Sequence, residues 1–330
     1  MIGASAGGVE ALRALVAGLP GDLPATVLIV LHVPRHSRSA LPAILSRFGP
    51  LPAAHAEDGE PLPVGQIRVA PSDHHLLVLD GRLRLSRGPA ENGHRPAVDP
   101  LFRSAARSHG PGVIGVVLSG SRDDGTAGLA AIVARGGTGL VQDPADAMIA
   151  NMPRSALEHV SVQRVLPADE LGKAIAETVL TLPAPTTEPA DALLDAETEM
   201  ANMGNITTDK QDARPAGLGC PSCRGALFEL PGAPAPRYRC RIGHAWSPES
   251  LLEEQAGALE GALWMALRAL EEKAAFVKRM AESARKRGNT GVATRLDASS
   301  IDAHEASGLI RQLIDGRGAA GPDQIAARRA

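Results

Sequence analysis

The chain opens with Met1-Ile-Gly-Ala-Ser5-Ala-Gly7-Gly8-Val-Glu-Ala-Leu12, in which a serine lies between glycines immediately before an amphipathic helical pattern. The glycines permit a tight turn that lifts a side chain off the end of a strand, and the helix that follows directs free N–H groups toward it. This arrangement favours Ser5 as a nucleophile. The alternative is a dinucleotide-type phosphate turn made by Gly3, Gly7 and Gly8, which the spacing G-x-x-x-G-G matches poorly. The segment by itself leaves both hypotheses open.

Composition limits the class of protein. With 330 residues, of which 44% are hydrophobic, the chain is expected to form two domains with a sizeable core. A net charge of −3 argues against a nucleic-acid partner, because phosphate binding needs a basic excess. Three cysteines, with neither an apolar leader nor a long apolar run, predict a cytoplasmic protein without membrane insertion.

The first half alternates β-like apolar runs with helical patterns, which predicts a doubly wound, mostly parallel α/β sheet with helices on both faces. The expected strands are 25–31, 66–70, 113–118 and 139–142, and the expected helices are 9–17, 39–48, 98–108, 126–135 and 168–182. Asp80-Gly81 between two alternating runs predicts an antiparallel hairpin over 75–86. Only Met1 and Ile2 precede the glycine turn, so the first strand is expected to be truncated or to begin upstream.

Changes of composition predict the domain organisation. The α/β domain is expected over residues 1–182, and a Pro-, Thr- and acid-rich linker over 183–217, with a short helix possible between Asp191 and Met203. The remaining expected segments are a zinc ribbon over 218–247, a helical hairpin over 248–316 and a disordered tail over 317–330.

Reactive side chains follow the apolar runs at the expected carboxyl ends of strands, where open parallel sheets bind their ligands. They are Ser5, His32 and the pair Asp123-Asp124. Serine needs a base to become nucleophilic, imidazole can take its proton near neutral pH, and a carboxylate orients the imidazole. The simpler interpretation of Asp124 is a cap for the helix that begins at Thr126. Taken together, the three residues favour a hydrolase.

These residues belong to a longer series of blocks that runs in order from residue 1 to about 182 and resembles the catalytic domain of CheB-type chemotaxis protein-glutamate methylesterases. The blocks are Gly3–Gly8, Leu31–Pro34, Ala56–Glu60, Ala70-Pro71, His94–Phe102, Leu118–Gly120 with Asp124-Gly125, and Met152–Arg154. The resemblance implies hydrolysis of γ-glutamyl methyl esters on methyl-accepting chemoreceptors, with release of methanol, and also deamidation of receptor glutamines. It implies Ser5 as nucleophile, His32 as general base and acid, Asp124 as orienting carboxylate, and no cofactor for catalysis.

The sequence departs from the family pattern in three ways. Gly120-Ser121-Arg122 stands where the family has Gly-Met-Gly, which alters the loop amide expected to help hold an oxyanion. Asp123 is a second carboxylate that could compete for His32, and the receiver domain that often precedes this domain is not expected here. A nucleotide-binding module and a catalytically impaired scaffold at the receptor array therefore remain as alternatives.

The three cysteines fall in Cys220-Pro-Ser-Cys223 and Cys240-Arg-Ile-Gly-His244, a spacing typical of one structural zinc site. The segments Leu227–Leu230 and Arg237–Cys240 flank Pro231-Gly232 and predict a hairpin that carries the second pair. The alternative is a set of reduced cysteines without metal.

A long helix is expected to begin at Ser247-Pro248-Glu249, with a coiled-coil-like apolar stripe that ends near Gly288 and Gly291. A second helix over 292–314 would fold back on it. Intramolecular packing is the simpler interpretation, and self-association or docking to a receptor array through these helices is the alternative.

Overall fold

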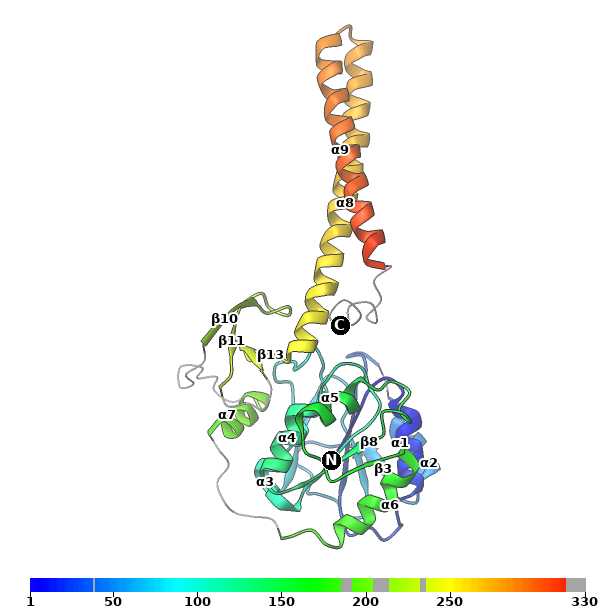
Figure 1. Cartoon of the computed structure of the whole chain (residues 1–330), viewed down its shortest axis with the longest axis vertical. Coiled ribbons are helices and arrows are strands. Elements are labelled where there is room, and N and C mark those ends of the chain that lie inside the picture. Colours follow the sequence, from blue (N-terminus) through cyan, green and yellow to red (C-terminus); the bar gives the residue numbers. More distant parts are fainter. Residues whose placement is uncertain (38, 185–191, 204–213, 232–235, 319–330) are drawn as a thin grey trace. The chain divides into compact units, whose positions relative to one another are not determined.

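A seven-stranded sheet in which all neighbouring strands run parallel forms the centre of the N-terminal half (Figure 1), in the order β3-β4-β2-β1-β7-β8-β9. The strands are β1 (Ile2–Ala4), β2 (Val27–Leu31), β3 (Ala53–His55), β4 (Ile67–Val69), β7 (Ile114–Val117), β8 (Thr138–Gln142) and β9 (Arg164–Leu166). This computed structural model describes residues 1–37, 39–184, 192–203, 214–231 and 236–318. Its two units are Met1–Leu251 and Leu252–Ala330.

Each face of the sheet is covered by helices because successive strand side chains point to opposite faces. Ile29 packs into a core with α1 (Gly8–Ala17), α2 (Leu41–Phe48) and α6 (Ala168–Val179). Leu28 and Val30 pack into a second core with α3 (Val98–His109), α4 (Thr126–Ala134) and α5 (Asn151–His159). Figure 1 shows α3 and α4 on one side of the sheet and α1, α2 and α6 on the other. The predicted α/β class with a parallel sheet is confirmed.

The order of the strands brings the expected reactive positions together. β1 lies between β2 and β7, so the chain leaves β1 toward one half of the sheet and later returns on its other side. Ligands of open α/β sheets bind at such a switch point, outside the carboxyl ends of the strands. The first strand is short, as expected, with only three residues. β3, β9 and α5 were not predicted from the sequence.

The predicted hairpin is present as β5 (His75–Leu79) and β6 (Arg82–Ser86), with Leu77 opposite Arg84. Asp80 and Gly81 both have positive φ, 50° and 71°, which the two-residue turn requires. The hairpin packs onto the face that carries α3, since Leu76, Val78 and Leu83 share its core.

Residues 214–231 and 236–247 form a four-stranded antiparallel sheet, called here the ribbon. Its strands are β10 (Arg214–Gly219), β11 (Ala226–Glu229), β12 (Tyr238–Cys240) and β13 (Ala245–Trp246). Leu227 pairs with Cys240, at the place of the predicted hairpin. Gly232, in the expected turn, lies outside the described residues. The expected linker contains α7 (Ala192–Ala201), at the position where a short helix was allowed, and its residues 185–191 and 204–213 lie outside the described residues.

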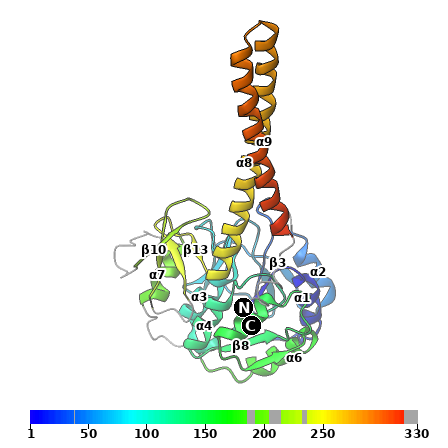
Figure 2. The ribbon, with the colours of Figure 1, turned by 45° about the horizontal axis from the view of Figure 1, so that its top comes forward.

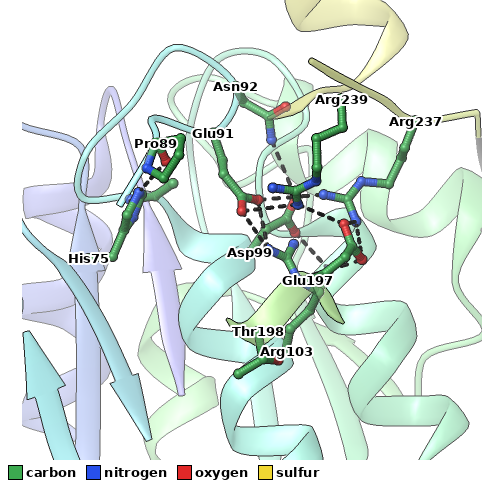
Figure 3. A network of polar contacts seen from close by, with 12 residues as sticks. His75, Pro89, Glu91, Asn92, Asp99, Arg103, Glu197, Thr198, Arg237 and Arg239 are labelled. Atoms are coloured by element: carbon green, nitrogen blue, oxygen red, sulfur yellow. Dashed lines mark hydrogen bonds and ion pairs between the residues drawn. The ribbon is translucent and has the colours of Figure 1, made fainter. Parts of the chain in front are cut away.

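Five buried charged side chains join α3, α7 and the ribbon in one ion-pair cluster (Figure 3): Glu91, Arg103, Glu197, Arg237 and Arg239. Glu91 accepts from Arg103 at 2.7 Å and from Arg239 at 3.2 Å. Glu197 accepts from Arg237 at 2.9 Å and from Arg239 at 2.8 Å. Burial raises the pKa of Glu91, but the charges of the three arginines outweigh burial and hold it below its usual value. The carboxylates are therefore ionised, and each depends on its partners.

In the second unit, helices α8 (Pro248–Lys286, which begins in the first unit) and α9 (Thr290–Gly318) form an antiparallel pair (Figure 2). The Ser300 hydroxyl donates to the Ala274 carbonyl at 2.9 Å, and Arg285 pairs with Asp297. This is the predicted fold-back, with Gly288 at φ 77° in the connection. Residues 319–330 of the expected tail lie outside the described residues. Within the described part of the chain, no helix has both the length and the apolar character needed to cross a membrane.

We expect Glu197→Ala to lower the free energy of unfolding by about 3–5 kcal/mol, because it leaves buried guanidinium groups without a counter-charge. Glu199 on the same helix is the matched control, since it is 51% exposed and lies 3.9 Å from Arg107. Glu199→Ala should cost less than about 1 kcal/mol. Urea unfolding followed by circular dichroism measures both, and equal losses would contradict a structural role for the cluster.

Candidate active site

The side chains of Ser5, His32 and Asp124 meet at the carboxyl ends of β1, β2 and β7. His32 Nδ1 lies 3.1 Å from Ser5 Oγ, and His32 Nε2 lies 2.7 Å from Asp124 Oδ2. The side chains of His32 and Asp124 are 5% and 1% exposed, and Ser5 is half-buried. The three residues that the sequence analysis singled out are therefore in hydrogen-bond contact, although 92 residues separate His32 from Asp124.

Backbone hydrogen bonds hold this edge together. The His32 amide donates to the Ala4 carbonyl at 3.1 Å, and the Ser5 amide donates to the Ser119 carbonyl at 2.9 Å. Gly120 lies so close that an added Cβ would come within 2.8 Å of Ser5 Cβ. Gly7, with φ 73°, caps α1 and leads directly into its first turn. The side chain of Ser5 is thus next to the amide end of α1.

The geometry fixes the tautomer of His32. Burial raises the pKa of Asp124, but the hydrogen bond and charge of His32 and the Val98 amide outweigh burial and hold it below its usual value. Asp124 is consequently a carboxylate, which can only accept, so His32 Nε2 carries the proton. In the neutral imidazole, the lone pair of Nδ1 then faces Ser5 Oγ, where it can accept the hydroxyl proton.

Asp124 and Asp99 cap the helices of one another. Asp124, just before α4, accepts from the Val98 and Asp99 amides of the first turn of α3, at 2.6 and 3.2 Å. Asp99 in turn accepts from the Gly125 and Gly128 amides at the start of α4, at 3.1 and 2.6 Å. Burial, together with the negative charge of Asp124, raises the pKa of Asp99 to about 7.

Two further residues at this site come from one turn that the sequence analysis had not assigned to it. His94 stacks on His32, with ring centroids 3.8 Å apart and planes 10° from parallel. Burial and the charge of His32 lower the pKa of His94 to about 3, so the stacked ring is neutral. Asn92 donates from Nδ2 to Asp124 Oδ1 at 3.1 Å. The Asn-Gly pair at 92–93 was the available signal, because it predicts a tight turn.

Asp123, the competing carboxylate of the sequence analysis, has different partners. Its Oδ1 accepts from the hydroxyls of Ser247 and Ser250, at 2.6 and 2.9 Å. Ser247 Oγ also accepts from the Ser250 amide at 3.2 Å, which is the N-cap interaction that begins α8. Asp123 therefore contacts the start of α8, while Asp124 contacts His32.

The four predicted metal ligands converge in the ribbon. One ligand atom from each of Cys220, Cys223, Cys240 and His244 lies within 4.8 Å of the others. Cys223 Sγ is 3.6 Å from Cys240 Sγ, which is 3.5 Å from His244 Nδ1. Ligand atoms on a tetrahedral zinc ion are separated by roughly 3.6–3.8 Å, given Zn–S of about 2.3 Å and Zn–N of about 2.1 Å. The donor set and its spacing fit one zinc ion with four protein ligands.

Comparison with known proteins agrees with the fold. Residues 1–175 match the CheB methylesterase family, and the chain belongs to that family. The chain is 42% identical over 177 residues to a protein-glutamate methylesterase/protein-glutamine glutaminase 2 of Anaeromyxobacter dehalogenans, covering 54% of this chain and 52% of that protein. It is also 42% identical over 197 residues to a protein-glutamate methylesterase/protein-glutamine glutaminase of Nocardioides, covering 58% of this chain and 53% of that protein.

A solved structure of the same family also resembles this chain. The crystal structure of the Thermotoga maritima CheB methylesterase catalytic domain has a TM-score of 0.52 and 32% sequence identity, over 54% of this chain and 96% of that domain. The chain spans about half the length of the curated relatives it matches.

The raised pKa of Asp99 predicts a pH-dependent stability. Between its unfolded value of 3.8 and its folded value of about 7, the folded protein binds one more proton than the unfolded chain at this site. The contribution of Asp99 to stability therefore falls as pH rises across this window. We expect the melting temperature of Asp99→Asn relative to wild type to increase from pH 5 to pH 8. Asp22→Asn, at an exposed position, is the control, and a constant difference for Asp99→Asn would contradict the prediction.

Proposed function

We propose that this chain is a serine esterase that hydrolyses γ-glutamyl methyl esters of methyl-accepting chemoreceptors, releases methanol, and also deamidates receptor glutamines. The observation that carries the proposal is the contact series Ser5 Oγ, His32 Nδ1, His32 Nε2 and Asp124 Oδ2, at 3.1 and 2.7 Å. Membership of the CheB methylesterase family and the names of the relatives support it.

The proposed reaction has two halves. Ser5 Oγ attacks the ester carbonyl while His32 Nδ1 takes its proton, and the resulting oxyanion forms near the amide end of α1. His32 then returns the proton to the leaving methoxide, which departs as methanol and leaves a γ-glutamyl ester on Ser5. Water attacks this ester with His32 as base, which restores Ser5 and releases the glutamate.

Asp124 and His94 have supporting roles in this proposal. The carboxylate of Asp124 orients the Nε2–H of His32 and stabilises the imidazolium that forms during each half-reaction. His94 lies on the face of the His32 ring and restricts its tilt. The loop Gly120-Ser121-Arg122 passes beside Ser5, and Arg122 has a φ of 63°. We propose that a backbone amide of this loop helps to bind the oxyanion, in a setting altered by the departure from Gly-Met-Gly.

Ser5→Ala should abolish methanol release from a receptor fragment that carries γ-glutamyl methyl esters, with an unchanged melting temperature, because the nucleophilic oxygen is lost. Gas chromatography of methanol measures the activity. A fluorophosphonate probe should label the wild type at Ser5 and not the variant. A wild type that neither releases methanol nor takes up the probe would favour the scaffold alternative, and methanol release by Ser5→Ala would contradict the mechanism.

We propose further that the ribbon holds one structural zinc ion through Cys220, Cys223, Cys240 and His244. All four positions would be protein ligands, so the ion would stabilise the ribbon without an open site for chemistry. The Trp246 indole N–H donates to Cys220 Sγ at 3.4 Å, which would orient that ligand.

Protein purified without chelator should contain about one equivalent of zinc by mass spectrometry, and Cys240→Ala should lose it together with part of the thermal stability, since a structural zinc site contributes directly to folding. Ser5→Ala is the control and should keep the metal. A wild-type zinc content below about half an equivalent would contradict the site.

The partner of the C-terminal helices also remains a proposal. The pair leaves large apolar side chains exposed, among them Trp264 at 51% and Phe276 at 57%. Association with a second copy of the chain or with a receptor array would remove such side chains from water, which is favourable.

A further inference from the structure

Asn92 connects Asp124 to the ribbon. Its Nδ2 donates to Asp124 Oδ1 at 3.1 Å and to Asp99 Oδ2 at 3.3 Å, and its Oδ1 accepts from the Ser247 amide at 2.9 Å. The residue is 2% exposed, and Figure 3 shows its side chain directed toward Asp99. The three polar groups that contact its amide thus come from α3, from the loop before α4 and from the residue that follows β13.

The Ser247 amide and the Asp124 carboxylate require the same orientation of the Asn92 side chain. A backbone N–H can only donate, so the atom that receives it must be the amide oxygen. The NH₂ group then has to face the carboxyl groups of Asp99 and Asp124. Loss of the Ser247 amide would take a hydrogen-bond donor away from this buried oxygen, and a buried acceptor without a partner is costly. The ribbon therefore helps to hold the orientation of a group that contacts Asp124.

The turn that carries Asn92 is itself held by the ribbon. The Asn92 amide donates to the Ala245 carbonyl at 2.9 Å, and the Ala245 amide donates to the Ala90 carbonyl at 3.4 Å. Next to Asn92, Glu91 accepts from Arg239 of β12. Asn92 and Gly93 have positive φ, 51° and 80°, and the backbones of Glu91 and His94 are hydrogen-bonded to each other in both directions, so the turn is a tight one. At its other end, His94 stacks on His32.

The remaining donors to Asp124 are of a different kind. Besides His32 and Asn92, Asp124 accepts from the backbone amides of Val98, Asp99 and Gly125. Those amides belong to the α/β domain and are present whether or not the ribbon is docked. Asn92 is the side chain through which the ribbon acts on the carboxylate.

We propose that Asn92 is a positioning residue for the esterase reaction, and that the Ser247 amide fixes it, so that the ribbon completes the active site of the α/β domain. The inference rests on the proposed function. In this arrangement Asn92 acts through Asp124, and does not contact the reacting atoms.

The test compares four full-length variants in methanol release from a peptide with one γ-glutamyl methyl ester, and in the labelling rate with a fluorophosphonate. Asn92→Gly removes the side chain and retains a residue suited to positive φ. Ser247→Pro and Ser247→Ala both lose the hydroxyl, but only Ser247→Pro loses the N–H that Asn92 accepts. The fourth protein combines Asn92→Gly with Ser247→Pro.

We expect Asn92→Gly to lower kcat by about tenfold or more, with KM within about twofold, as loss of a hydrogen bond to a charged group predicts. Ser247→Pro should be slower than Ser247→Ala by a similar factor. The combined variant should be no slower than Asn92→Gly, because both changes break the same series of contacts. Labelling rates should follow kcat, which separates activation of Ser5 from substrate binding.

Asn92→Asp provides a second measurement should the glycine variant fold poorly. It keeps an oxygen for the Ser247 amide and puts another where Nδ2 donates, so kcat should fall increasingly as pH rises and the new carboxyl ionises beside Asp124. An inactive, unlabelled wild type would overturn the proposed function. With an active wild type, unchanged kcat in Asn92→Gly, or equal rates for Ser247→Pro and Ser247→Ala, would overturn the role of Asn92 and the ribbon.

Discussion

A buried carboxylate needs hydrogen-bond donors for both of its oxygens. The donors to Asp124 come from several elements around the site, and this requirement holds those elements together. Five groups donate to Asp124: His32, Asn92 and the amides of Val98, Asp99 and Gly125. Removing a buried charge from water is costly unless such donors replace the water. His32 follows β2, Asn92 lies in the turn before α3, Val98 and Asp99 begin α3, and Gly125 precedes α4. The ionised state of Asp124 therefore depends on several elements being in place together.

The reciprocal capping of α3 and α4 extends this constraint. Each helix receives at its amide end a carboxyl group from the start of the other, Asp124 on α3 and Asp99 on α4. The approach is close because Gly125 and Gly128 have no Cβ to meet Val98 and Phe102. This arrangement buries a second carboxyl group, that of Asp99, beside Asp124. Burial and the negative charge of Asp124 raise the pKa of Asp99 to about 7. The same contact therefore stabilises the helix ends and makes the site sensitive to pH.

Charge also explains how the ribbon and α7 pack on the α/β domain. Glu91 and Glu197 lie among three arginines that come from α3 and the ribbon, and the cluster is buried. Such a cluster is specific in orientation, because any displacement leaves a buried charge without its partner. It places Ala245 and Ser247 against the turn at Asn92, next to Asp124.

Local patterns in the sequence were enough for the long elements and for the sheet type, and they placed Ser5, His32 and the pair Asp123-Asp124 after expected strands. They were not enough for β3 and β9, which have three residues each and too short a pattern to recognise. The positions of Asn92, His94 and Asp99 at the site, and the contact of Asp123 with α8, arise only in the tertiary structure. Their partners are distant in sequence, and a side chain's hydrogen-bond partner depends on which elements pack together.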